Sequence, residues 1–166
     1  LVLSTLHTND AVGAIPRLID LGAKPQILGP ALSLVIAQRL VRKLCESCRT
    51  QVTLTAKLKT NIETFLKNLP FRVDKNAYKN YTLFDKKGCT ECGGLGYRGR
   101  TSIFELFVVT EKIEELIYAS PTEMQLLGLA KAQEMTTMQE DGILKALQGI
   151  TSLDEIERLT GPLSIR

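Results

Sequence analysis

Two C-x2-C pairs constrain this chain more than any other feature of its sequence. Cys45-Glu-Ser-Cys48 and Cys89-Thr-Glu-Cys92 are separated by 40 residues and contain every cysteine of the chain. A C-x2-C turn directs both sulfurs into one hollow, and two turns that face each other form the tetrahedral four-sulfur site that zinc favours. The glycines after the second pair allow backbone N–H groups to bend back toward the thiolates. The sequence therefore predicts a structural zinc ion held by Cys45, Cys48, Cys89 and Cys92.

Other uses of the cysteines fit the pattern less well but stay open as alternatives. A redox site of the thioredoxin type has a single C-x2-C beside a βαβ unit, disulfides are uncommon without a secretory leader, and a catalytic zinc keeps one position open. CTECGGLG also fits the C-x-x-C-x-G-x-G repeat of the zinc domain in J-domain co-chaperones. That domain contains four such repeats, whereas this chain contains one.

Charged residues are distributed unevenly along the chain. Residues 1–38 contain two basic and two acidic residues, residues 39–100 contain fourteen and five, and residues 101–166 contain five and eleven. A basic segment can bind nucleic acid or anionic lipid, but its aromatic residues do not alternate with the cations as a stacking platform requires. We expect no nucleic-acid partner and expect cations near the cysteines to offset the charge of four thiolates. These cations are Arg42, Lys43, Arg49, Lys86, Lys87, Arg98 and Arg100.

Hydrophobic periodicity predicts an α/β fold that a cysteine-bearing insertion interrupts. We expect strands at 1–6, from about residue 33 to the first cysteine pair, and at 100–109, the first and last of them buried. A helix capped by Asn9 or Asp10 and closed by Gly22 should follow the first strand, and a second should start at Lys24-Pro25.

The remaining helices are predicted from apolar spacing and from capping patterns. Residues 55–69 place apolar side chains on one helix face inside the insertion. In the C-terminal region, Ser120-Pro-Thr-Glu and Ser152-Leu-Asp-Glu predict helix starts of the capping-box type. A short helix should lie between Gly142 and Gly149. Residues 70–88 give no clear pattern.

His7, the only histidine, lies in STLHTND at the end of the first expected strand. In one interpretation, its side chain only tethers the turn from strand to helix. In the other, it contacts a phosphate or a water, because ligands bind at the strand ends of open α/β sheets. The residues do not decide between these interpretations.

Four segments together resemble the C-terminal part of the ATPases that assemble type IV pili and drive type II secretion. They are TLHTNDAVGAIPRLIDLG, AQRLVRKLCESC, CTECGGLGYRGRTSIFEL and MTTMQEDGILKALQGITSLDEIERLTG, in that order over nearly the whole chain. Residues 49–88 match poorly, and Ser102 stands where the family usually has Gly. The tetracysteine segment favours the assembly and secretion branch over retraction motors.

The resemblance implies a RecA-like P-loop fold in a hexameric motor, cytoplasmic and peripheral to the inner membrane. It implies ATP and Mg²⁺ as further cofactors, an inner-membrane platform protein as partner, and a place for His7 in a His box beside the nucleotide. The corresponding division is 1–44 as the end of the ATPase core, 45–92 as the zinc insertion, 93–110 as a returning core strand and 111–166 as a helical region.

The phosphate-binding sequence of such an ATPase is missing from these residues. No G-x-x-x-x-G-K-[ST] occurs, and the chain begins without Met inside an apolar run. We therefore expect a C-terminal fragment that does not hydrolyse ATP alone, with no membrane-spanning segment. The alternative from another class is a noncatalytic, zinc-stabilised protein-interaction module.

Overall fold

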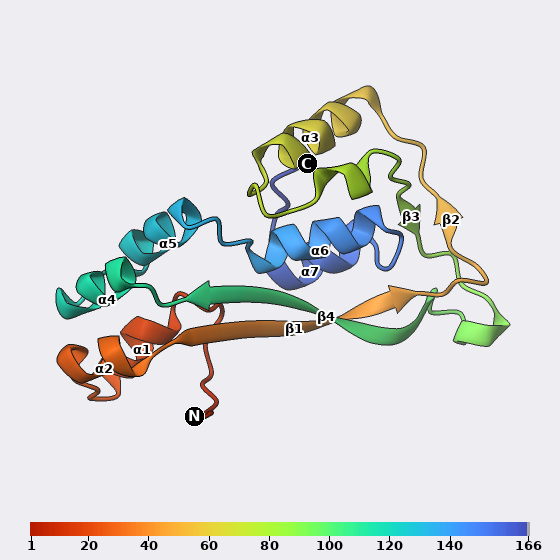
Figure 1. The fold of residues 1–166 in the computed structure, drawn as a ribbon. Coiled ribbons are helices and arrows are strands. Elements are labelled where there is room, and N and C mark those ends of the chain that lie inside the picture. Colours follow the sequence, from red (N-terminus) through yellow and green to blue (C-terminus); the bar gives the residue numbers. More distant parts are fainter. Residues whose placement is uncertain (166) are drawn as a thin grey trace. The chain divides into compact units, whose positions relative to one another are not determined.

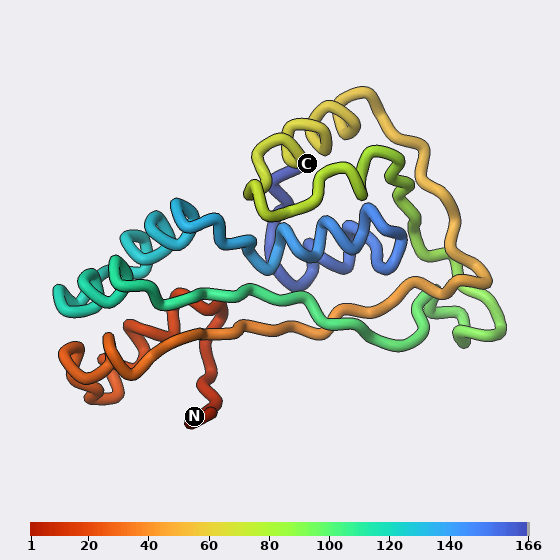
Figure 2. The backbone as a smooth tube through the Cα atoms, viewed as in Figure 1, coloured from red at the N-terminus to blue at the C-terminus, as the bar shows by residue number. Residues whose placement is uncertain are grey.

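The computed structural model describes residues 1–165 and divides them into two compact units. The first unit contains residues 1–38 and 105–136, and the second contains residues 39–104 and 137–165. Strands β1 (Leu34–Leu44) and β4 (Tyr97–Val108) form a two-stranded sheet, and each contributes residues to both units (Figures 1 and 2). Helices and small sheets together make this an α/β structure.

The first unit is built from four short helices, α1 (Ala14–Asp20), α2 (Pro25–Ala31), α4 (Glu111–Tyr118) and α5 (Glu123–Ala132). Helix α2 packs against α4, and α4 packs against α5. Their apolar faces meet in one buried cluster with residues from the turn before α1 and from β4. This cluster contains Ala11, Val12, Ile15, Leu28, Phe107, Ile113, Ile117, Leu126, Ala130 and Met135.

The strand expected at residues 1–6 is not formed. Leu1, Val2 and Leu3 are almost fully exposed, and no strand among the described residues pairs with this segment. A strand needs a hydrogen-bonding neighbour, which apolar composition alone does not supply. The prediction of a buried strand here is therefore wrong for this structure.

The helix boundaries of the first unit agree with the sequence in part. Asp10 caps a turn and not the helix itself, because its Oδ1 accepts the Gly13 N–H at 2.8 Å before α1 begins at Ala14. Gly22 ends the helix with a positive φ of 93°, as expected. Thr122, and not Ser120, caps α5 and forms a capping box with Gln125. Ser120 instead has a φ of 50°.

Strand β4 has one buried face and one exposed face. Ile103, Glu105 and Phe107 are buried, whereas Phe104 and Leu106 between them are 40% and 51% exposed. The prediction of a fully buried strand at 100–109 is therefore wrong. Side chains alternate between the two faces of a strand, and in the described residues only one face of this strand is covered.

The second unit surrounds the cysteines with short elements and two packed helices. It contains β2 (Thr50–Gln51), α3 (Ala56–Asn68), a 3-10 turn η1 (Lys75–Tyr78), β3 (Phe84–Asp85), a second turn η2 (Thr90–Cys92), α6 (Met138–Leu147) and α7 (Leu153–Thr160). Strands β2 and β3 pair antiparallel, with Thr50 opposite Asp85 and Gln51 opposite Phe84. Helix α6 packs against α7 (Figure 1).

The expected helix inside the insertion is confirmed as α3. Thr55 caps it, since its Oγ1 accepts the Leu58 N–H at 3.2 Å, and Ile62 and Phe65 of the expected apolar face are buried. Asn61 on the same helix donates to the carbonyl of Ile165 at 3.1 Å. The C-terminal tail therefore lies against the insertion.

Two glycines have different roles in α6. Gly142 lies inside the helix and does not precede it, so that expectation is wrong. The helix is capped five residues earlier by Thr137, which forms a capping box with Glu140. A Cβ at Gly142 would come within 2.8 Å of Ile156 Cδ1, so the glycine permits close packing of α7. Gly149 follows the helix with a φ of 72°, as a C-terminal glycine does.

Among residues 1–165, no helix combines the length and the apolar character needed to cross a membrane.

Candidate metal centre

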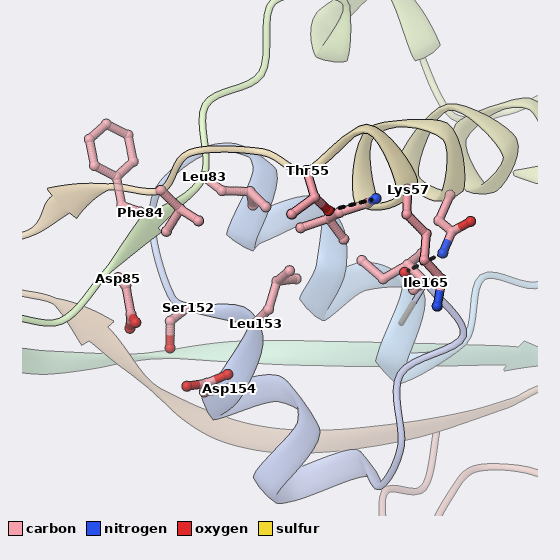
Figure 3. A pocket seen from close by; sticks show the side chains of 12 residues that line it. Thr55, Lys57, Leu83, Phe84, Asp85, Ser152, Leu153, Asp154 and Ile165 are labelled. Carbon is pink, nitrogen blue, oxygen red and sulfur yellow. Dashed lines mark hydrogen bonds between the residues drawn. The ribbon is translucent and has the colours of Figure 1, made fainter.

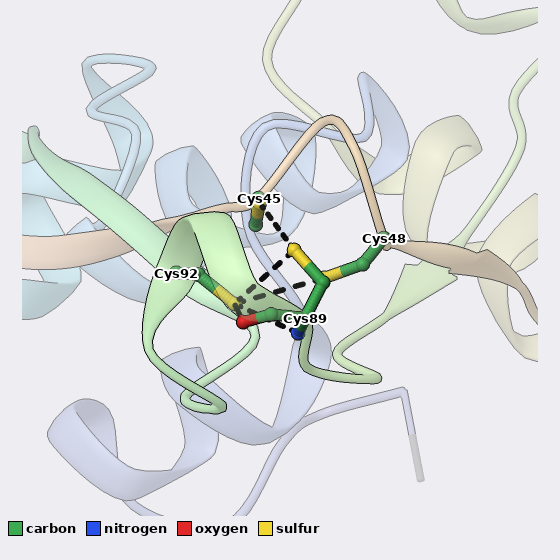
Figure 4. A group of neighbouring side chains, drawn as sticks. All are labelled: Cys45, Cys48, Cys89 and Cys92. Atoms are coloured by element: carbon green, nitrogen blue, oxygen red, sulfur yellow. Dashed lines mark hydrogen bonds between the residues drawn. The ribbon is translucent and has the colours of Figure 1, made fainter.

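The structure brings the four cysteine sulfurs together. All four lie within 4.8 Å of one another (Figure 4). The sulfur atoms of Cys45 and Cys89 are 3.9 Å apart, those of Cys48 and Cys92 are 3.9 Å apart, and those of Cys89 and Cys92 are 3.8 Å apart. Four ligands placed tetrahedrally about 2.3 Å from a zinc ion are about 3.8 Å apart. The residues therefore fit a tetrahedral four-sulfur metal site, and all four cysteines are free thiols and not disulfides.

The first pair is placed by the end of β1. Its turn closes through two backbone hydrogen bonds to the carbonyl of Cys45, from Cys48 N at 3.2 Å and from Arg49 N at 2.9 Å. Cys45 N also donates to the carbonyl of Gly96 at 3.0 Å, which ties the first turn to the segment after the second pair. The two cysteine turns are therefore joined by backbone as well as by their sulfurs.

The second pair depends on the glycines that follow it. Cys92 Sγ accepts N–H groups from Cys89 and Gly96, both at 3.2 Å. Gly96 has a φ of 74°, and a Cβ there would lie 2.5 Å from Lys86 Cβ. A side chain at this position is excluded by both its conformation and its neighbour. The expectation that glycines bring N–H groups to the thiolates is confirmed.

The thiols differ in their acidity because their surroundings differ. The hydrogen bond from Cys89 N, aided by the one from Gly96, lowers the pKa of the Cys92 thiol to about 6 against the effect of burial. Burial raises the pKa of the Cys48 thiol to about 11, although the backbone of Gly88 acts in the opposite direction. Backbone N–H groups thus prepare one sulfur of the cluster to act as a thiolate.

Several cations expected to offset the thiolates bind other groups. The Arg42 guanidinium pairs with Glu155, Arg49 Nη1 donates to the carbonyl of Gly149, and Arg98 pairs with Glu91 at 3.6 Å. Their positive charges still lie in the second unit. For Arg42 and Arg49, however, the structure adds a role that attaches the first cysteine turn to the segment between α6 and α7.

Glu155 was missed as a site residue, because SLDE indicates only a capping box. Ser152 does cap α7, accepting the Glu155 N–H at 3.2 Å, but the Glu155 carboxylate binds Arg42 and Arg158. Burial raises the pKa of this carboxyl, and the hydrogen bonds from Arg158 and Arg42 outweigh that effect and hold the pKa at about 2. No local signal pairs Glu155 with Arg42, which is 113 residues away.

His7 is exposed, and the strand that was expected to end beside it is absent. The structure therefore leaves both interpretations of this residue as they stood. His7 belongs to the first unit and the four cysteines belong to the second.

A cavity of about 320 Å³ also lies in the second unit. Figure 3 shows Thr55 and Lys57 from the start of α3, Asp85 from β3 and Asp154 from the start of α7 around it. Apolar side chains make up much of its wall, including Leu58, Leu83, Leu153 and Ile165. None of the cysteines lines it, so the metal centre and this cavity are separate features.

Comparison with known proteins places the chain in a family. Residues 1–158 match the family model described as "Type II/IV secretion system protein". The chain belongs to this family. That match includes both cysteine pairs and all the elements of the first unit.

Relatives of the chain are named as secretion or pilus assembly proteins. The chain is 40% identical to "Type IV pilus assembly ATPase PilB" of Thermus thermophilus, over 94% of this chain and 16% of that protein. It is 41% identical to "Type II secretion system protein E" of Klebsiella pneumoniae, over 96% of this chain and 29% of that protein. It is 39% identical to "Type II secretion system ATPase E" of Vibrio cholerae, over 96% of this chain and 29% of that protein. The chain thus spans less than a third of the length of these relatives.

Proposed function

We propose that the chain is the zinc-bearing part of a motor ATPase that powers assembly of a type IV pilus or a type II secretion pseudopilus. Support comes from relatives named as pilus and secretion ATPases. The four converging sulfurs carry the metal part of the proposal. Since they supply four soft ligands, a zinc ion held by them would have no open position for substrate. Its role is to hold the second unit in shape.

In this proposal the parent protein has a RecA-like P-loop fold, acts as a hexamer at the cytoplasmic face of the inner membrane, and uses ATP and Mg²⁺. Residues 1–44 and 93–110 belong to the ATPase core, residues 45–92 form the zinc subdomain, and residues 111–166 form a C-terminal helical region. His7 belongs near the nucleotide. The chain itself contains no G-x-x-x-x-G-K-[ST] and should not hydrolyse ATP alone.

Two measurements test the two parts separately. Metal analysis of the purified chain should give one zinc per chain, and the Cys45→Ser/Cys89→Ser double variant should give none. ATP hydrolysis should be absent from the chain and present in a longer protein that adds a G-x-x-x-x-G-K-[ST] sequence. ATP turnover by the pure chain would contradict the assignment of catalysis to other residues.

The basic surface of the second unit is our proposed contact for a membrane platform protein or an adjoining subunit. Lys86 and Lys87 are exposed next to the second cysteine pair, and Lys43 lies two residues before the first. Arg42 also lies near the first pair, but its guanidinium binds Glu155, so we leave it out of the proposed contact. Charge reversal of the three lysines should weaken assembly of the machine and leave zinc content unchanged. Unchanged assembly would reject this contact and favour a purely structural module.

A further inference from the structure

One segment, Gly149–Glu155, holds the first cysteine turn from both sides. It comprises the turn after α6 and the first residues of α7. Leu44 N, just before Cys45, donates to the carbonyl of Ile150 at 2.9 Å. Arg49, just after Cys48, donates from Nη1 to the carbonyl of Gly149 at 2.5 Å, although the two residues are 100 positions apart.

Arg42 attaches the end of β1 to the same segment. Its backbone N–H donates to Glu155 Oε1 at 3.1 Å, and its Nη2 donates to Oε2 at 2.5 Å. Its carbonyl accepts the Thr151 hydroxyl at 2.9 Å. The Glu155 side chain is fully buried. A buried carboxylate that binds both the backbone and the side chain of one residue fixes where the strand ends and the cysteine turn begins.

The segment also reaches the strand after the second pair. The hydroxyls of Tyr97 and Ser152 lie 2.7 Å apart in a buried hydrogen bond. The Arg42 guanidinium stacks over the Tyr97 ring, 4.3 Å from its centre. The first cysteine turn and the strand that follows the second are therefore both attached to Gly149–Glu155, which contains no cysteine.

We propose that Gly149–Glu155 is the outer support of the metal centre, with Glu155 and Arg49 as positioning residues that set its metal affinity. This inference rests on the metal site proposed above. Groups that orient metal ligands from outside typically change affinity by about 10- to 100-fold. Because coupling between two events is reciprocal, binding of metal should also stabilise α7 in its docked position.

The test compares Glu155→Gln with a matched control, Asp141→Asn. Like Glu155, Asp141 in α6 has a carboxylate that binds both a strand backbone and a cation. It accepts the Phe104 N–H at 2.8 Å and pairs with Lys145. Within residues 1–165, neither of these partners of Asp141 lies beside a cysteine. Zinc affinity is measured by competition with a chromophoric chelator, at a temperature where circular dichroism shows each variant folded. We expect Glu155→Gln to lower zinc affinity by about 10- to 100-fold and Asp141→Asn to change it far less.

Equal losses of affinity in the two variants, or no loss in Glu155→Gln, would overturn the inference. If Glu155→Gln does not fold, Arg49→Lys serves in its place, because it keeps the charge and removes the guanidinium that reaches Gly149; affinity equal to wild type would then count against the proposal. Cobalt bound to either variant should keep the absorption of a tetrahedral four-thiolate site, since no ligand is removed. Loss of that absorption would mean that these residues determine ligation itself.

The reciprocal effect has its own measurement. Hydrogen exchange of the α7 amides should be slower with zinc than after chelation, while the α5 amides of the first unit serve as an internal reference. Equal exchange of α7 in both states would overturn the coupling. If the wild-type chain binds no zinc at all, the proposed metal site fails instead, and the two failures are thereby distinguished.

Discussion

Each of the two units is stabilised internally by a different kind of interaction. In the first unit, the buried set is an apolar cluster in which Ile113, Ile117 and Leu126 are completely inaccessible to solvent, together with one buried carboxylate, Glu105, which accepts the Ala11 N–H at 3.0 Å. In the second, four thiols and the buried Glu155 stand beside the apolar residues. An apolar cluster tolerates small changes of shape, whereas a ligand set and a buried carboxylate lose their value when one partner is removed. Removal of one such partner should therefore destabilise the second unit more than a small change of shape in the apolar cluster destabilises the first.

Metal removal should give the largest difference between the units. Zinc binding contributes roughly 10 to 16 kcal/mol of apparent free energy in small zinc-finger peptides, so chelation, or the Cys45→Ser/Cys89→Ser variant, should unfold much of the second unit. Hydrogen exchange resolved by segment is the measurement. Amides of α3 and α7 should lose protection, and those of α4 should lose far less. Similar losses of protection in both units would show that the second unit does not depend on the metal more than the first.

Truncation in the apolar cluster should reverse the pattern. Ile113→Ala removes a fully buried side chain of α4 and should lower the free energy of unfolding of the first unit by about 2 to 5 kcal/mol. Denaturant unfolding measures the loss. Zinc content should stay at the wild-type value, and a drop in zinc content would link the cluster to the metal centre.

Loss of the Glu155 carboxylate should lower the free energy of unfolding by an amount that does not depend on pH near neutrality. Glu155→Gln weakens charge-assisted hydrogen bonds to Arg42 and Arg158 and should cost about 1.5 to 3 kcal/mol. With a folded-state pKa of about 2 against an ordinary value of 4.5, the carboxylate stabilises the fold above pH 4.5, and this contribution is lost as the pH falls toward 2.

The cost of Glu155→Gln should thus be constant between pH 8 and 5. Urea unfolding of the zinc-bound wild type and variant at several pH values gives the difference. A cost that changes within this range while both proteins keep their zinc would show that the carboxyl titrates near its ordinary pKa or above it.

Two helix glycines provide the finest comparison. Gly142→Ala in α6 would place a Cβ 2.8 Å from Ile156 and should destabilise the second unit by about 1 to 3 kcal/mol. Gly128→Ala in α5 meets no atom within 4 Å and should stabilise the first unit by about 0.5 to 1 kcal/mol. Thermal unfolding should show a lower midpoint temperature for Gly142→Ala and a higher one for Gly128→Ala. Shifts in the same direction would contradict the close packing of α6 against α7.

Local patterns in the sequence were sufficient for helix α3 and for the cysteine cluster. Helix α3 follows from its apolar spacing and from Thr55, and the sulfur cluster follows from two C-x2-C turns that use every cysteine. Both depend on interactions within a few residues or on chemistry that leaves few alternatives. Gly22 and Gly149 likewise end helices where the sequence placed them.

Pairing across the chain was decided only by the tertiary structure. The apolar segment 1–6 has strand composition but no strand partner among the described residues. Strand β4 is buried on one face and not on both. The attachment of Arg42 to Glu155 joins residues 113 positions apart, and neither residue carries a local signal for the other. Helix caps and metal turns are specified by neighbours in sequence, whereas strand partners and buried ion pairs are specified by which segments the folded chain brings together.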